Sequence, residues 1–206
     1  FSHDMRQFVF KVVVRGPLPE NGSTLFLADL NSGNVRVLWQ GQNNIGDPRW
    51  SFDDRFIIYE EAGYSRQPRI QIYEVQTGSV TEIAIPAKKF NLNNQTVSFE
   101  DINWSPTEMT LAYTLEIGDI QQVFYETYTA HLDCVDTPLT CAVSNVKQLD
   151  AVNNLWRSVS WNRDGTLIAS GYNDFSAGGF SQDEPAVIDI RRPDGTPYQR
   201  IDLSSQ

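Results

Sequence analysis

A four-fold internal repeat constrains the fold of this chain more than any other feature of its sequence. Each copy begins with an aromatic residue and a small polar residue, passes through a four-residue turn and ends in an apolar stretch of strand length. The copies begin at Phe1, Trp50, Trp104 and Trp161, so they are spaced by 49, 54 and 57 residues. Such a period is typical of architectures in which each repeat is one supersecondary unit.

Strands and hairpin turns fill the sequence between these aromatic anchors. In the second repeat, Arg69–Val75 alternates like a strand, Gln76–Ser79 is a turn and Val80–Ile85 returns. The other repeats have equivalent pairs at 24–30 with 35–39, at 123–132 with 143–149 and at 186–190 with 198–203. No stretch has a 3.6-residue period, so we expect little or no helix. Each repeat therefore predicts four antiparallel strands, named A to D.

Four-stranded repeats of this period predict an all-β fold, a β-propeller with blade repeats at approximately 1–40, 41–86, 87–149 and 150–206. Phe1 falls at the end of a strand A, so the first blade should lack most of its innermost strand. Propellers typically have about four to eight blades. We therefore expect an open arc or part of a larger propeller, with a closed four-bladed ring as the alternative. The apolar sides of the terminal blades should be covered by another protein subunit, a second copy of the chain or further parts of a parent protein.

The anchors resemble a known family, the TolB-like propellers, whose repeat reads Trp-Ser-Pro-Asp-Gly before an apolar strand. Trp50–Asp53, Trp104–Pro106 and Trp161–Gly165 carry most of that signature. Two departures stand out, because Thr107–Glu108 replaces Asp-Gly in the third repeat and Phe1 replaces the tryptophan in the first. The resemblance covers essentially the whole chain and implies six or more blades in the intact ring. It implies little about function, since one fold hosts many functions.

Structural roles are expected for the most regular residues of the repeat. The anchor tryptophans should wedge between adjacent blades, and the turn aspartates should accept backbone N–H bonds within their own turns. These residues are Trp50, Trp104, Trp161, Asp4, Asp53 and Asp164.

Two cysteines, Cys134 and Cys141, flank a short polar segment in the third repeat. We expect a disulfide between them, with two unrelated buried thiols as the alternative. A disulfide predicts an exported protein, extracellular or periplasmic. The sequons at Asn21 and Asn94 are compatible with export, and the first residue, Phe1, indicates a processed or excised piece of something longer.

The net charge of −10 makes nucleic acid an unsuitable partner, because phosphates would repel the chain. No run of 18 apolar residues occurs, so no transmembrane segment is expected.

The long loops that join strand B to C and strand D to the next A are the expected binding surface, since function tends to lie on loops of a rigid scaffold. Their acidic and aromatic residues suit a protein or a carbohydrate partner, although they could equally be solvated loops with local packing. The residues that we select are Tyr64, Phe90, Tyr172, Phe175, Phe180, Glu60, Glu61 and Asp174.

Catalytic motifs were sought and not found. The chain has no Gly-x-Ser-x-Gly, His-Glu-x-x-His, EF-hand or phosphate-loop sequence, and only His3 and His131 supply imidazoles. Carboxylate pairs such as Glu100 and Asp101 could bind Ca²⁺ weakly or exchange protons, but neighbours on a strand point to opposite faces. We therefore expect no enzyme activity, no cofactor and no metal.

The sequence thus favours a non-catalytic propeller module of an exported protein that acts as a protein-binding or assembly scaffold. One alternative is an accessory propeller segment of a larger enzyme, such as a serine peptidase of the prolyl-oligopeptidase type. Another is a carbohydrate-binding module that uses Tyr64, Tyr172 and Phe175.

Overall fold

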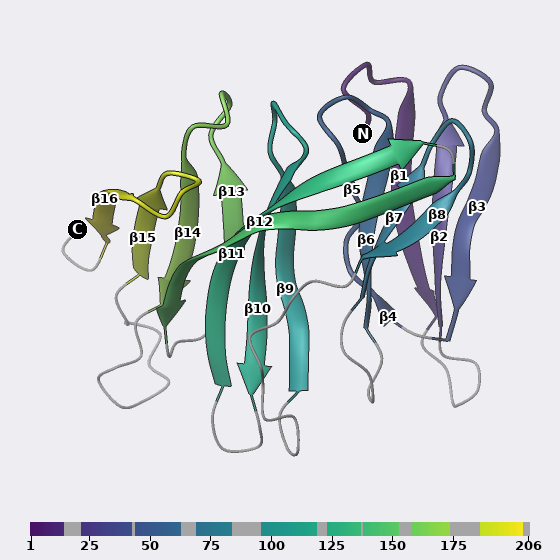
Figure 1. The fold of residues 1–206 in the computed structure, drawn as a ribbon. Helices are drawn as coiled ribbons and strands as arrows, with labels where there is room; N and C mark the ends of the chain where they lie inside the picture. The colour runs from purple at the N-terminus through teal and green to yellow at the C-terminus, as the bar shows by residue number, and fades with distance from the viewer. Residues whose placement is uncertain are drawn as a thin grey trace. The chain divides into compact units, whose positions relative to one another are not determined.

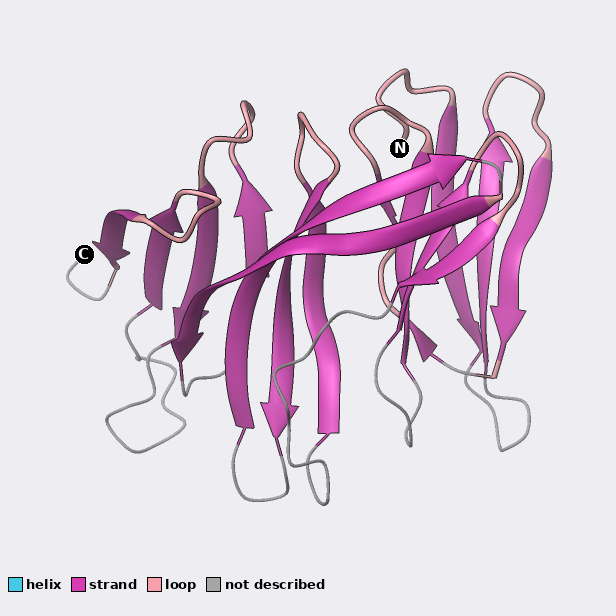
Figure 2. Ribbon diagram, in the orientation of Figure 1, coloured by secondary structure: helices cyan, strands magenta, loops and turns pink. Residues whose placement is uncertain are grey.

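In the computed structural model, β-strands are the only regular secondary structure of the described residues (Figure 2). It describes residues 1–14, 22–42, 44–62, 69–83, 96–118, 123–136, 138–152, 158–173 and 186–203. Within these ranges sixteen strands form four antiparallel sheets, none of which closes on itself. No helix occurs in this part of the chain, so no helical membrane span is found there either. The expected all-β, blade-type fold is confirmed.

The four sheets follow one another along the chain, and we call them blades 1 to 4 (Figure 1). Blade 1 has only three strands, β1 (Gln7–Val14), β2 (Gly22–Asp29) and β3 (Val35–Gly41). Blade 2 contains β4 (Asn44–Ile45), β5 (Arg49–Trp50), β6 (Phe56–Ala62), β7 (Arg69–Glu74) and β8 (Val80–Ile83). Its strand A is broken in two, because β4 and β5 both pair with β6.

Blades 3 and 4 each have four strands in simple sequential order. Blade 3 contains β9 (Thr96–Trp104), β10 (Thr110–Gly118), β11 (Val123–Asp136) and β12 (Leu139–Val152). Blade 4 contains β13 (Ser158–Trp161), β14 (Ile168–Asn173), β15 (Ala186–Arg191) and β16 (Pro197–Asp202).

The repeated turn between strands A and B has the same backbone hydrogen bond in all four blades. The residue after the anchor donates its N–H to the carbonyl oxygen five residues further on. The donor–acceptor pairs are Ser2–Gln7 at 2.9 Å, Ser51–Phe56 at 2.9 Å, Ser105–Thr110 at 2.7 Å and Asn162–Leu167 at 3.0 Å. Phe1 therefore occupies the anchor position of blade 1, although the blade lacks a described strand A.

Side chains reinforce this turn in three of the blades. The aspartate three residues after the anchor accepts a backbone N–H two residues further on, as the turn sequence predicts. The bonds are Arg6 to Asp4 at 2.9 Å, Arg55 to Asp53 at 3.2 Å and Thr166 to Asp164 at 3.0 Å. These carboxylates therefore belong to the scaffold.

The next residue of the turn has a positive φ in the same three blades, at Met5 (58°), Asp54 (58°) and Gly165 (73°). In blade 3 the corresponding residue, Glu108, does not have a positive φ. There Thr110 donates its N–H to the Glu108 carbonyl oxygen at 2.8 Å. The departure seen in the sequence at Thr107–Glu108 is thus a real difference in turn geometry.

The chain divides into two compact units. One consists of Phe1–Ile85 with Asp133–Ala142, and the other of Pro86–Leu132 with Val143–Gln206. Blades 1 and 2 therefore lie in the first unit together with the tip of the blade 3 hairpin, and the rest of blade 3 lies with blade 4 in the second.

The hairpin of blade 3 is longer than we expected. β11 and β12 each have 14 residues and continue past the two cysteines. The strands that we expected at 123–132 and 143–149 left both cysteines in the loop between them. Cys134 and Cys141 form the expected disulfide between these two strands, with their Cα atoms 4.1 Å apart. The prediction of strand ends at Leu132 and Val143 was wrong, because polar β-branched residues can extend a hairpin without burial.

Some of the expected loops are also strands. Glu60, which we expected in a loop, lies in β6, and Glu100 and Glu116 lie in β9 and β10. Glu60 is opposite Ile70, and Glu116 is opposite Tyr125, whose hydroxyl donates to it at 3.0 Å. Cross-strand pairing therefore places Glu60 and Glu116 within the sheets.

Candidate binding surface

Most of the residues that we selected for binding lie outside the part of the chain that the structure describes. This holds for Tyr64, Phe90, Asp174, Phe175 and Phe180. Glu61 and Tyr172 lie in β6 and β14, where the backbone is described but the side chains are not. Only Glu60 is described fully, as a half-buried residue of β6 whose carbonyl oxygen accepts the N–H of Gly46 at 3.0 Å. Their role in binding remains a prediction.

The adjacent carboxylates of blade 3 have separate environments. Asp101 accepts the backbone N–H of Val159 at 2.9 Å, and Asn103 donates its side-chain N–H to the Val159 carbonyl oxygen at 2.6 Å. Asp101 thereby holds β13 of blade 4 against β9. Glu100 is the extra residue at a register shift of β9. Burial, with a smaller contribution from Glu116, raises the pKa of Glu100 above its usual value.

No group of three or more His, Cys, Asp or Glu side chains that could hold a metal occurs within the described ranges.

The two sides of a blade differ in which repeat positions they carry. We call the side with the anchor residue the leading face, which in blade 2 consists of Trp50, Ile57 and Tyr59. The opposite side is the trailing face, which in blade 1 consists of Val9, Leu25 and Leu27. Successive residues of a strand point to opposite faces of the sheet, and residues paired across two strands point to the same face. The pairing of Trp50 with Ile57 therefore puts both on the leading face, and the pairing of Val9 with Leu27 puts both on the trailing face.

The trailing face of blade 1 packs against the leading face of blade 2. Leu25, Leu27, Trp50, Ile57 and Tyr59 belong to one core cluster in which each is at most 9% exposed. The partly buried Val9 packs against the same cluster. This interface removes a large apolar area from water and is the main contact between the two blades.

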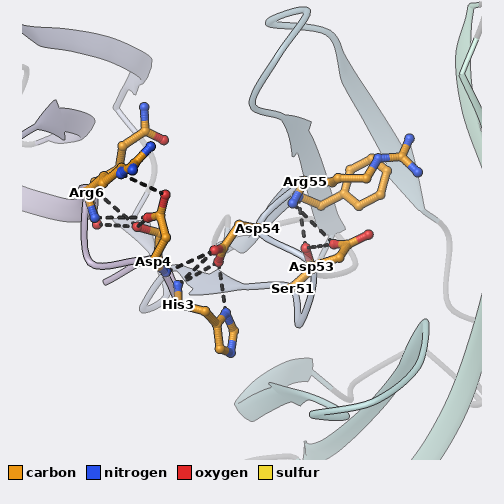
Figure 3. A network of polar contacts seen from close by, with 10 residues as sticks. His3, Asp4, Arg6, Ser51, Asp53, Asp54 and Arg55 are labelled. Carbon is orange, nitrogen blue, oxygen red and sulfur yellow. Dashed lines mark hydrogen bonds and ion pairs between the residues drawn. The ribbon is translucent and has the colours of Figure 1, made fainter.

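A polar contact completes the junction between blades 1 and 2, at their A–B turns (Figure 3). The Asp54 carboxylate accepts the backbone N–H of His3 at 2.8 Å and that of Asp4 at 3.3 Å. The ring Nδ1 of His3 lies 2.8 Å from the same carboxylate. Along the strands, the Lys11 ammonium donates to the Ile45 carbonyl oxygen at 3.1 Å and pairs with Asp47 at 2.8 Å.

The second unit repeats the apolar part of this arrangement. Ala112 on the trailing face of blade 3 shares a cluster with Val159 and Ile168 of blade 4, and Trp161 packs against it. The Trp161 indole N–H also donates to the Asn103 carbonyl oxygen at 3.3 Å. Trp50 and Trp161 thus both lie where one blade meets the preceding blade in the same unit. Trp104 is 8% exposed.

The leading face of blade 1 is the exception. Phe1, Phe8 and Phe10 occupy the positions that Trp50, Ile57 and Tyr59 occupy in blade 2. Phe1 is 67% exposed, whereas Trp50, Ile57 and Tyr59 are 9%, 0% and 0% exposed. Phe8, Phe10 and Phe26 form a row with ring centroids 5.1 and 5.2 Å apart.

Exposed apolar side chains continue from this partly buried row. Val12 follows Phe8 and Phe10 on the same side of β1, and it is 43% exposed. Val37 lies opposite Phe26 and Val35 lies opposite Ala28, so both share this face at 54% and 57% exposure. An exposed apolar patch of this kind marks an interaction surface. It is the candidate binding surface of the described structure.

Sequence reasoning expected an exposed apolar side on a terminal blade but named none of these residues. The sequence does contain a signal for this face. Phe8 and Phe10 follow the anchor Phe1 by seven and nine residues, as Ile57 and Tyr59 follow Trp50 in the second repeat.

Comparison with known proteins found similar folds among solved structures. An oligogalacturonate lyase from Vibrio parahaemolyticus superposes with a TM-score of 0.62 at 14% identity, over 97% of this chain and 51% of that chain. An acylaminoacyl peptidase from Pyrococcus horikoshii gives 0.61 at 12% identity, over 96% and 31%. The β-propeller domain of the Trilobed protease from Pyrococcus furiosus gives 0.57 at 14% identity, over 95% and 53%.

These likenesses establish the fold and nothing finer, because the identities are so low. This chain spans about half the length of the lyase and of the protease propeller domain. No protein-family model and no curated protein matches the sequence.

Proposed function

We propose that the chain, which has a β-propeller-type fold, is a non-catalytic module that binds another protein. The observation that carries this proposal is the exposed leading face of blade 1. Its positions are those that another blade covers in blade 2, and Phe1 and Val12 are 67% and 43% exposed. A surface with this apolar content gains most from a protein partner.

Export is part of the same proposal. The disulfide between Cys134 and Cys141 supports an oxidising compartment, extracellular or periplasmic, because disulfides persist there and are rare in the cytosol.

The test is affinity capture from exported proteins of the source organism, with the wild-type chain and the Phe8→Glu variant as baits. Any captured protein is then produced separately and its affinity for both baits is measured by calorimetry. We expect a purified partner that binds the wild-type chain and binds Phe8→Glu at least 10-fold more weakly, because a charge then replaces an apolar contact.

The matched control is Val135→Glu, which adds the same charge at a residue of the blade 3 hairpin that is 64% exposed. This control should bind like the wild type. Equal binding of the partner by all three chains would contradict the proposal.

A second candidate is an accessory propeller segment of a larger enzyme. It is favoured by the match to the propeller domain of a protease, of which this chain covers 53%. A hydrolase domain with a Gly-x-Ser-x-Gly motif in the same coding sequence would support this candidate. A complete coding sequence without such a domain would remove it.

A further inference from the structure

The connection between strands C and D is much longer in blade 3 than in blades 1 and 2. Strand D starts at Val35 in blade 1 and at Val80 in blade 2, directly after a short turn. In blade 3 the hairpin continues through Asp133–Ala142, which we call the insertion. The end of strand C is marked in these three blades by the same backbone bond to the A–B turn, from the N–H of Leu30 to the carbonyl oxygen of Arg6 at 2.8 Å, from Val75 to Arg55 at 2.9 Å and from Leu132 to Met109 at 2.8 Å.

The insertion belongs to a different compact unit from the rest of its own blade. Asp133–Ala142 is grouped with Phe1–Ile85, the part of the chain that contains blades 1 and 2. The division falls directly after Leu132, which is the position where strand C ends in blades 1 and 2. The insertion is therefore a piece that blade 3 contributes to the first unit.

The insertion has one covered face and one exposed face. Successive residues of a strand point to opposite faces, and the disulfide requires Cys134 and Cys141 to lie on the same face. Leu139 precedes Cys141 by two residues on β12, so it shares that face, and it is only 7% exposed. The opposite face carries four exposed residues, Asp133, Val135, Thr140 and Ala142.

The burial of Leu139 requires a cover from outside the hairpin, because two strands alone have no second layer to pack against. The grouping of the insertion with blades 1 and 2 indicates that the first unit supplies this cover. The disulfide lies on the covered face beside Leu139. Because a closed loop has fewer unfolded conformations, the disulfide favours the shape in which Leu139 is covered.

We propose that the insertion is a strap that stabilises the first unit, and that its disulfide makes this strap sensitive to redox conditions. A dithiol such as dithiothreitol supplies two electrons and two protons, leaves as a cyclic disulfide and converts Cys134 and Cys141 into thiols. The opened insertion then adopts more conformations, and Leu139 leaves its covered position more often. Blades 1 and 2 thereby lose apolar contact without any change in their own sequence.

The test is hydrogen–deuterium exchange of the full chain, followed by mass spectrometry. Leu139→Asp puts a charge on the covered face of the insertion. Thr140→Asp is the matched control, because it puts the same charge on the next residue, which is on the exposed face. A double variant, Cys134→Ser with Cys141→Ser, removes the disulfide, and the folded wild type is measured before and after dithiothreitol is added.

We expect the amides of β7 in blade 2 to exchange about 10-fold faster in Leu139→Asp and in the double serine variant than in the oxidised wild type, because the first unit opens more often. The reduced wild type should match the double serine variant, and Thr140→Asp should match the oxidised wild type. The amides of β15 in blade 4 should be unchanged in every sample, since blade 4 belongs to the second unit.

Three results would overturn the proposal. They are faster exchange that is confined to residues 123–152, equal effects of Leu139→Asp and Thr140→Asp, and equally faster exchange in β7 and β15. Should Leu139→Asp fail to fold, the folded wild type before and after reduction decides the question. Unchanged exchange in β7 after reduction would then contradict the strap.

Discussion

Blades 1 and 2 carry the same repeat and yet use it in opposite ways. Ile57 of blade 2 is 0% exposed against blade 1, whereas its counterpart Phe8 is only partly buried. Trp50 and Phe1 differ likewise, at 9% and 67% exposure. The comparison shows that the same repeat positions are buried where a neighbouring blade packs against them and remain at least partly exposed where none does. The predictions that follow test this difference between the two blades.

The largest effect is expected from truncation of equivalent apolar residues. Ile57→Ala should lower the free energy of unfolding by about 3 kcal/mol, because it leaves a cavity in a packed interface. Phe8→Ala should cost about 1 kcal/mol or less, since its ring packs mainly against its own sheet. Urea denaturation of both variants, at concentrations where the chain is monomeric, measures the difference. Equal losses would show that the two faces are equally buried.

A smaller loss is expected at the polar junction of the two blades. Asp54→Asn keeps the size of the side chain but removes the charge that accepts the N–H groups of His3 and Asp4. We expect a loss of about 1 kcal/mol, because charge-assisted hydrogen bonds are stronger than neutral ones. The measurement is again urea denaturation.

The control for this junction is Asp194→Asn in blade 4, where the carboxylate accepts the N–H and the hydroxyl of Thr196 within its own turn. It should lose less stability than Asp54→Asn. A larger loss at Asp194 would mean that Asp54 stabilises its own turn more than the contact between blades.

Lys11→Met should have a still smaller effect, below about 1 kcal/mol, because Asp47 is largely exposed. Lys11 lowers the pKa of Asp47, chiefly through its hydrogen bond. The substitution should therefore raise that pKa toward the ordinary value, as measured by NMR titration of the Asp47 carboxyl. An unchanged Asp47 pKa would contradict the ion pair.

The smallest effect is expected from the turn of blade 1 at acid pH. The N–H of Arg6 and then the hydroxyl of Ser2 lower the pKa of Asp4 below 3.8. This carboxylate therefore contributes stability above its unfolded pKa, and the contribution is lost as the pH falls through the folded value.

Asp4→Asn should accordingly flatten the dependence of the melting temperature on pH below 3.8. Asp164→Asn in blade 4 should act in the same direction, because the Thr166 hydroxyl and N–H lower the pKa of Asp164. Melting curves that keep the wild-type acid slope in both variants would show that these turns do not stabilise the fold.

Local features of the fold could be predicted from the sequence with good accuracy. The A–B turns follow from a small polar residue and an aspartate at fixed offsets from the anchor, and the turn at Gly195 follows from Pro193-Asp194-Gly195. The disulfide follows from the short segment between Cys134 and Cys141. All of these depend on residues that are close together in the chain.

Strand ends and the candidate surface were less predictable. Glu60 was expected in a loop, because its partner across the sheet, Ile70, is not visible in a local sequence window. In the sequence, Phe8 and Phe10 resemble ordinary core residues, because a local window does not show whether another sheet packs against them. Their spacing matches that of Ile57 and Tyr59, whose near-complete burial depends on blade 1.

The sequence by itself determined the repeat, the antiparallel hairpins and the turns, because these follow from alternation and from hydrogen bonds between near neighbours. Only the tertiary structure decided which copies of a repeated position are buried. Burial depends on whether another sheet lies against that position. The sequence of one repeat is therefore compatible with the packed face of blade 2 and with the exposed face of blade 1.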